Sequence, residues 1–332
     1  MPARVVAAFA LASACARTPA DDLELGSDAG DAATVSTTST SSSTSSTSSE
    51  SSSSEDDGTV VLDVASHSDL GGAPLACRAI DFLFVVDDSG SMDPYQQALV
   101  ASFPGFIAGI EDALATVDGV HVAVTTSDSY VYNTPECTWI GSSIVRTGGE
   151  ASSNATCGPY AEGHNYMTEA DDLGERFACA ARVGTGGDPI ERPMNAVVDA
   201  MRDATPGTHP CNAGFIRDDA RLVVLVITDE YDGPDDPEGD GSLGTPQSWY
   251  DAVVAAKGGL ASNVAVVVLT HFADGPCPPA DVGHDGVHLV DFAQRFGDHG
   301  FVGGICEPDY AVPFAEAIDV VVQACSDFVP PG

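Results

Sequence analysis

The residues from Ile80 to Val86 read IDFLFVV, and the polar stretch DDSGS follows them at positions 87–91. A short, continuous apolar run predicts a strand buried on both faces, as in the interior of a parallel sheet. The apolar residues that come next recur at intervals of three and four, the spacing of one helix face: Leu99, Phe103, Ile107, Ile110 and Leu114. The stretch therefore predicts a buried strand, a polar loop and an amphipathic helix, which Pro104 is expected to kink.

Similar apolar runs recur along the chain and predict three more buried strands. They are Val120–Thr126, Arg221–Thr228 and Asn263–Thr270. Helical patterns predict helices around Met194–Met201 and Val312–Cys325. Apolar strands that alternate with amphipathic helices are typical of an α/β fold, so we expect a doubly wound, mostly parallel sheet flanked by helices, Rossmann-like in its organisation.

The loop at 87–91 offers oxygen atoms to a cation. It follows the carboxyl end of the first strand, where ligands bind in open α/β sheets. Asp87 can supply a carboxylate, and Ser89 and Ser91 can supply hydroxyls, all donors that Mg²⁺, Ca²⁺ or Mn²⁺ prefer. Gly90 lets the loop turn tightly. The alternative is that these residues only cap the following helix, since Asp and Ser both accept hydrogen bonds from N–H groups at helix N-termini.

The strand-borne Asp-x-Ser-x-Ser pattern, the order of strands and helices, and an Asp at the end of a later strand resemble the metal-ion-dependent adhesion site of von Willebrand factor type A domains. The resemblance extends from Cys77 to Phe328. It implies a divalent cation, Mg²⁺ with Ca²⁺ or Mn²⁺ as alternatives. It also implies four residues that bind this cation, directly or through water: Asp87, Ser89, Ser91 and Asp229.

In that family a Thr from a second loop completes the metal site, and the matching loop here offers two candidates. Thr185 has the hydroxyl that the family uses and lies in a Gly-rich turn, and we favour it. Glu191 lies closer to the start of the next helix, where the family's Thr is found. If Glu191 is the ligand, the site carries an extra negative charge, which holds the metal more tightly and makes it less attractive to an acidic partner.

The resemblance implies a cell-surface module for adhesion or protein binding, in which the cation is bridged by an Asp or Glu carboxylate of a protein ligand. Two other functions stay open: a secreted hydrolase that uses the cation as a Lewis acid, and a structural envelope protein with a non-functional site. We expect no enzyme and no catalytic residues, because the chain has no Gly-x-Ser-x-Gly elbow, no His-Glu-x-x-His pair and no phosphate or dinucleotide loop.

The chain is strongly acidic. Its 332 residues include 50 acidic and 12 basic ones, for a formal net charge of −38, and 43% of the residues are hydrophobic. A field of this sign repels phosphate backbones, so we expect no nucleic acid partner. The hydrophobic content suffices for one sizeable core.

The first residues predict export. Residues 1–15 read as a lipoprotein-type signal peptide, with an apolar run from Val5 to Ala14 too short to span a bilayer and a lipid-bearing Cys15. Residues 16–58 predict a disordered acidic tether rich in Ser and Thr, residues 59–76 a lead-in segment, and residues 77–328 the folded domain. We expect an exported protein held by its N-terminal lipid at a bacterial envelope, on the outer membrane or cell surface, with no other membrane contact.

Eight cysteines remain in the domain once Cys15 is set aside, and in an exported chain they predict disulfides: Cys77, Cys137, Cys157, Cys179, Cys211, Cys277, Cys306 and Cys325. The pairings that we favour join Cys77 to Cys325 across the domain, and Cys277 to Cys306 and Cys137 to Cys157 locally, which leaves Cys179 with Cys211. The polar insertion at about 129–177 is expected to carry an edge strand or hairpin ordered by disulfides.

Overall fold

The computed structural model describes residues 77–114, 117–188, 190–203, 211–233, 241–273, 275 and 285–330. The predicted signal peptide, tether and lead-in segment, at 1–15, 16–58 and 59–76, lie outside the described residues. Of the helices described, none has the length and apolar character needed to cross a bilayer.

One six-stranded sheet organises the described residues, in the order β3-β2-β1-β4-β5-β6. The strands are β1 (Ala79–Val86), β2 (Gly119–Thr126), β3 (Met167–Thr168), β4 (Arg221–Ile227), β5 (Val264–Thr270) and β6 (Gly300–Gly304). All neighbouring pairs are parallel except β2 and β3. The doubly wound, mostly parallel α/β fold predicted from the sequence is confirmed.

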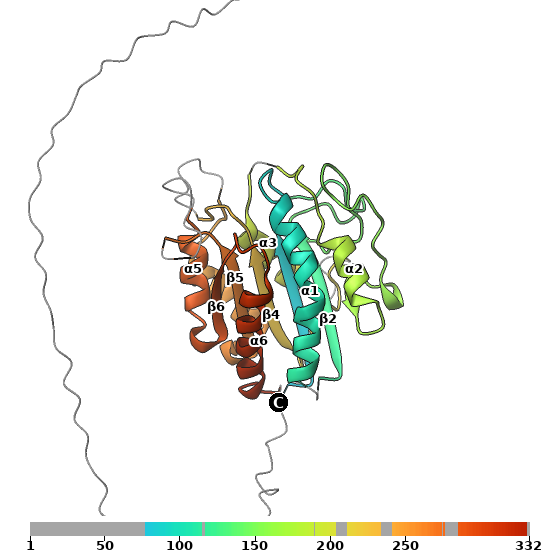
Figure 1. The fold of residues 1–332 in the computed structure, drawn as a ribbon. Helices are drawn as coiled ribbons and strands as arrows, with labels where there is room; N and C mark the ends of the chain where they lie inside the picture. Colours follow the sequence, from blue (N-terminus) through green and yellow to red (C-terminus); the bar gives the residue numbers. More distant parts are fainter. Residues whose placement is uncertain are drawn as a thin grey trace, which may run out of the picture. The chain divides into compact units, whose positions relative to one another are not determined.

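Helices cover both faces of the sheet (Figure 1). They are α1 (Asp93–Ala113), α2 (Leu173–Ala180), α3 (Pro193–Asp203), α4 (Pro246–Ala256), α5 (Val287–Gln294) and α6 (Ala311–Ser326), with short 3₁₀ turns η1 (Ala161–Gly163), η2 (Ala261–Asn263) and η3 (Gly297–His299). Helices α1 and α6 lie side by side on one face, with α2 next to α1. Helix α1 passes through Pro104 as one continuous element.

The alternation of β1 side chains explains why its sequence is apolar throughout. Phe82 and Phe84 pack into the core beneath α1, α2 and α6. Leu83 and Val85 point the other way, into the core beneath α3, α4 and α5. Because a central strand has no solvent-facing side, both sets of residues are apolar, and the one charged residue of the strand, Asp81, is paired with Arg217.

The insertion contributes the edge strand that the sequence predicts. Within it, Met167 and Thr168 form β3, which pairs antiparallel with β2. The sequence analysis missed this strand's position, and it also missed β6, α2, α4 and α5. Strand β6 is GFVGG, a run too short and too rich in Gly to give a hydrophobic pattern.

Three disulfides are formed between described cysteines. The bridge from Cys77 to Cys325 is confirmed, and it joins the start of β1 to α6. The predicted pairings Cys137–Cys157 and Cys179–Cys211 are wrong, since the bridges are Cys137–Cys211 and Cys157–Cys179. Both tie the insertion to elements that follow it, whereas the predicted Cys137–Cys157 loop would have closed the insertion only upon itself. Cys306 is also disulfide-bonded, and its expected partner Cys277 lies outside the described residues.

The bridge Cys77–Cys325 closes a loop of 248 residues, against 22 for Cys157–Cys179. In the chain-entropy account, a bridge stabilises by restricting the unfolded chain, and more so for longer loops. Replacing Cys77 and Cys325 together by Ser should therefore lower the free energy of unfolding by about 5 kcal/mol, and replacing Cys157 and Cys179 by about 3 kcal/mol. Urea unfolding of the two variants measures this, and the reverse ranking would contradict the entropic account.

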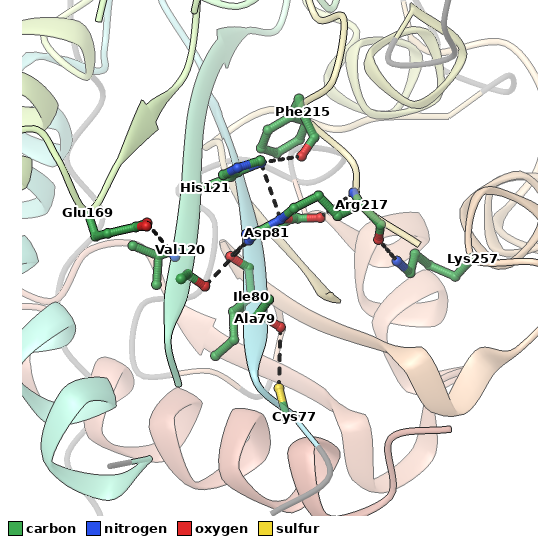
Figure 2. Close-up of polar contacts among 11 residues, drawn as sticks. Cys77, Ala79, Ile80, Asp81, Val120, His121, Glu169, Phe215, Arg217 and Lys257 are labelled. Carbon is green, nitrogen blue, oxygen red and sulfur yellow. Dashed lines mark hydrogen bonds and ion pairs between the residues drawn. The ribbon is translucent and has the colours of Figure 1, made fainter. Parts of the chain in front are cut away.

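A buried ion pair lies at the amino-terminal end of the sheet (Figure 2). Asp81, which is fully buried on β1, accepts hydrogen bonds from the backbone N–H and the Nε of Arg217, each at 2.7 Å. Lys257 donates to the Arg217 carbonyl, and His121 Nδ1 lies 2.8 Å from the Phe215 carbonyl. Burial lowers the pKa of His121 to about 4, so the ring is neutral at pH 7 and donates to that carbonyl. The cluster fixes the segment that precedes β4.

Burial raises the pKa of Asp81 from 3.8 to about 6, even though the Arg217 charge opposes this. A raised pKa stabilises the folded state below pH 4, and that contribution is lost as pH rises through 6. Asp81→Asn has no such loss. We therefore expect wild type to lose about 2–3 kcal/mol of stability relative to Asp81→Asn between pH 4 and pH 7.

Urea unfolding at several pH values tests this, with the exposed Asp118→Asn as a control for net charge. If wild type instead gains stability over Asp81→Asn as pH rises, attraction to Arg217 outweighs the cost of burial.

Candidate metal site

The topology brings three loops together at the carboxyl end of the sheet. Strand β1 lies between β2 and β4, so the strands that follow β1 in sequence, β2 and then β4, lie on opposite sides of it. This is the switch point at which ligands bind in open α/β sheets. The loop that begins at Asp87 follows β1, and the one that contains Asp229 follows β4. Residues 138 apart in sequence, Ser91 and Asp229, are joined here by a hydrogen bond.

Asp87 is the best-anchored residue of the site. Its backbone N–H donates to the Ile227 carbonyl at 3.1 Å and so continues the β1–β4 pairing. Its fully buried carboxylate accepts from the Ser89 N–H at 2.7 Å and from the Thr228 hydroxyl at 2.5 Å. The carboxylate is therefore held in one orientation by two neighbouring loops.

The predicted serines connect Asp87 to Asp229. The hydroxyls of Ser89 and Ser91 are 3.1 Å apart, and Ser91 Oγ donates to Asp229 Oδ1 at 3.0 Å. Carboxylate oxygens of Asp87, Asp229 and Glu230 all lie within 4.8 Å of one another. Glu230 was not among the residues predicted to bind metal. Its adjacency to Asp229 was the signal available in the sequence.

Helix capping does not account for these side chains. Helix α1 begins at Asp93 with Met92 at its N-cap, and no side chain makes a capping hydrogen bond there. Ser89 instead accepts the Met92 N–H through its backbone carbonyl, at 3.2 Å. The hydroxyls of Ser89 and Ser91 are thus available to the acidic cluster and not engaged by the helix.

The second predicted loop lies against the first. Gln96 on α1 donates to the carbonyls of Asp87 (2.9 Å) and Gly184 (2.7 Å), and its Oε1 accepts from the Gly184 N–H (3.0 Å). Beside Gly184, Thr185 donates its own N–H to the Glu150 carbonyl at 2.9 Å. Glu191 interacts electrostatically with Asp87 and accepts a hydrogen bond from Ser127. Glu191 thus lies within electrostatic range of Asp87, whereas Thr185 contacts the Glu150 backbone.

Burial and neighbouring negative charges disfavour the ionised form of the carboxyl groups in the site. Burial, and then the charge of Asp229, raise the pKa of Asp87 to about 7. Burial, and then the charges of Asp87 and Asp88, raise the pKa of Glu191 to about 11. Carboxylates crowded in this way must bind protons or a cation.

The donor set fits a hard divalent cation. Three carboxylates and two hydroxyls supply oxygen atoms only, as Mg²⁺, Ca²⁺ and Mn²⁺ require. Asp87 lies at the buried floor, whereas Asp229 and Glu230 are half-buried and Ser91 is exposed. An ion held by these residues would therefore have one side open to solvent.

No protein-family model and no curated protein matches the chain. Among solved structures it is similar to proximal thread matrix protein 1 from the mussel byssus, in two structures, with 13% identity, TM-scores of 0.38 and 0.35, and coverage of 74% and 75% of this chain. It is also similar to the pilus adhesin SpaC from Lactobacillus rhamnosus GG in its open conformation, with 13% identity, a TM-score of 0.37 and 75% coverage. The chain spans 48% and 47% of the byssus protein and 30% of the adhesin. Likeness this distant leaves function to be argued from the site.

A cation bound at Asp87 should stabilise the fold. At about one hundred times its dissociation constant it would contribute about 2.7 kcal/mol, or about 5–10 °C in the melting temperature. Asp87→Asn should abolish this rise. At pH 8 without metal it should cost less than about 1 kcal/mol, because it removes a buried negative charge beside Asp229.

Thermal melts at pH 8 with EDTA, Mg²⁺, Ca²⁺ or Mn²⁺ measure both effects. Asp112→Asn, an exposed change on the same helix as Gln96, is the matched control and should keep the full rise. A purely structural Asp87 would show the opposite pattern: a large loss without metal, and no rise in wild type.

Proposed function

We propose that this chain is a divalent-cation-dependent protein-binding module of the von Willebrand factor type A kind, displayed at a cell surface. The observation that carries the proposal is the cluster at the switch point, where Asp87, Ser89, Ser91 and Asp229 form one connected set. These are the four residues that the resemblance assigns to the metal. Mg²⁺ is the proposed ion, with Ca²⁺ or Mn²⁺ as alternatives.

The arrangement supports binding of an acidic partner. A cation there would supply positive charge at the surface, and its open side would accept an Asp or Glu carboxylate of a protein ligand. Ser89 and Ser91 add no negative charge to the site, because their hydroxyls are neutral.

Binding is preferred to catalysis as the role of this site. A hydrolase needs a base or nucleophile placed beside the cation, and Glu230 is the nearest acidic group. Glu230 itself belongs to the oxygen cluster, so it is better placed to bind the ion than to accept a proton from substrate. We propose that the chain has no enzymatic activity.

Display at the surface rests on the sequence. We propose that Cys15 bears the lipid and that the Ser- and Thr-rich residues 16–58 hold the domain away from a bacterial envelope membrane. Disulfides among the described residues support an oxidising, exported setting.

Selection of a random peptide display library on the immobilised domain tests partner chemistry without knowledge of the natural ligand. In Mn²⁺ the selected peptides should share one Asp or Glu, release with EDTA, and bind at least ten times more weakly when that residue becomes Asn or Gln. The double variant Ser89→Ala, Ser91→Ala should not retain them, whereas Asp112→Asn should. Peptides that bind equally in EDTA, or that share no acidic residue, would exclude the proposed mode of binding.

A further inference from the structure

A second pair of buried carboxyl groups lies beside the proposed site but does not belong to it. Asp88 follows Asp87 directly, yet its carboxyl faces Asp128, in the loop after β2. Asp88 is only 1% exposed and Asp128 6%. Neither oxygen of Asp88 has a hydrogen-bond donor, and Oδ1 of Asp128 has none either.

The surrounding backbone holds this pair in place. Asp128 Oδ2 accepts the Asp188 N–H at 2.6 Å, and the Asp88 carbonyl accepts the Gly187 N–H at 3.0 Å. A Cβ atom at Gly187 would lie only 2.7 Å from Asp88 Cγ, so only glycine lets this loop pack so closely on the carboxyl. The two carboxyl groups are therefore kept together by three loops and cannot separate to find donors elsewhere.

Three of the four oxygens of this buried pair lack a hydrogen-bond donor, so the two carboxylates need a positive partner. Isolated buried charges are costly, and like charges in contact add to the cost. Either a proton is shared between the two groups, or a cation lies between them.

A cavity of about 320 Å³ leads to the pair. Its lining includes Asp88, Asp128 and Asp188, together with Tyr130 and Tyr132. The volume admits a hydrated ion. A third acidic group also faces this region, because Glu191 interacts with the charges of Asp88 and Asp128 and its Oε1 has no hydrogen-bond partner.

We propose that Asp88 and Asp128 hold a second divalent cation, separate from the one at Asp87 and Asp229. The oxygens that lack donors are its ligands, with water completing its coordination from the cavity. Glu191 lies within electrostatic range of both Asp87 and Asp88. The second ion would therefore offset the negative charge of the loops that support the first site.

The number of tightly bound Mn²⁺ ions tests this. After equilibrium dialysis at about 150 mM salt, which screens the acidic surface, elemental analysis should find two Mn²⁺ per wild-type chain. Asp128→Asn should bind one, and Ser89→Ala, Ser91→Ala should also bind one. Asp188→Asn is the matched control, since it removes an exposed charge from the rim of the same cavity, and it should bind two.

Asp128→Asn is expected to fold, because the new amide can donate to Asp88 in place of a shared proton, and circular dichroism verifies this. One ion in wild type and in Asp128→Asn, with none in the double serine variant, would overturn the second site in favour of a shared proton and leave the proposed function standing. Equal numbers in the wild type and all three variants would place the ions on the acidic surface and overturn both proposals.

Discussion

The structure depends on one buried carboxylate, that of Asp87, which directly follows the central strand β1. Asp87 continues the pairing of β1 with β4 through its backbone, and its side chain is fully buried between two loops. A charge in this position would destabilise the fold without compensation. The Ser89 N–H and the Thr228 hydroxyl each provide one hydrogen bond, and carboxylate oxygens of Asp229 and Glu230 lie within 4.8 Å of one of the Asp87 oxygens. The proposed cation would offset this crowding of carboxylates.

The insertion supports the site from a distance. Its Tyr130 hydroxyl donates to the Val183 carbonyl at 2.5 Å, one residue before Gly184, which is held by Gln96. The bridges at Cys137 and Cys157 join the insertion to the segment before β4 and to α2. The long connection after β2 is therefore not a free loop. It is a segment held by two disulfides, and it positions the loop of Gly187 and Glu191 at the carboxyl end of the sheet.

The sequence predicted the fold well wherever burial imposes a pattern. The four long central strands each fall within one residue of their expected bounds at either end, because a strand with helices on both faces must be apolar throughout. The same rule cannot find β6 or β3, which are short edge strands. Of the disulfides, only Cys77–Cys325 is confirmed among the described residues, because these two are the outermost cysteines of the domain. The partners of Cys137 and Cys179 depend on how the insertion folds back, which the local spacing of cysteines does not show.

The site was predicted in the same uneven way. Asp87, Ser89 and Ser91 share one short motif, and Asp229 ends a strand that must be adjacent to β1 in this fold. Glu230 and Asp128 carry no such mark, because an acidic residue in a loop of an acidic chain is usually solvated. The proximity of Glu230 to Asp87 and Asp229, and the burial of Asp128, arise from tertiary packing.

The net charge of −38 is therefore a poor guide to cation binding by itself. An exposed carboxylate is neutralised by water and salt, so it contributes to a diffuse attraction that any cation satisfies. Water and salt cannot reach a buried carboxylate that has no hydrogen-bond donor. Its ligand must therefore match it in charge, size and position. Asp87 and Asp88 are adjacent in sequence, yet the first shares a cluster with Asp229 and the second faces Asp128. Because the backbone directs the two side chains to different neighbours, one acidic dipeptide at the end of β1 can serve two separate polar centres.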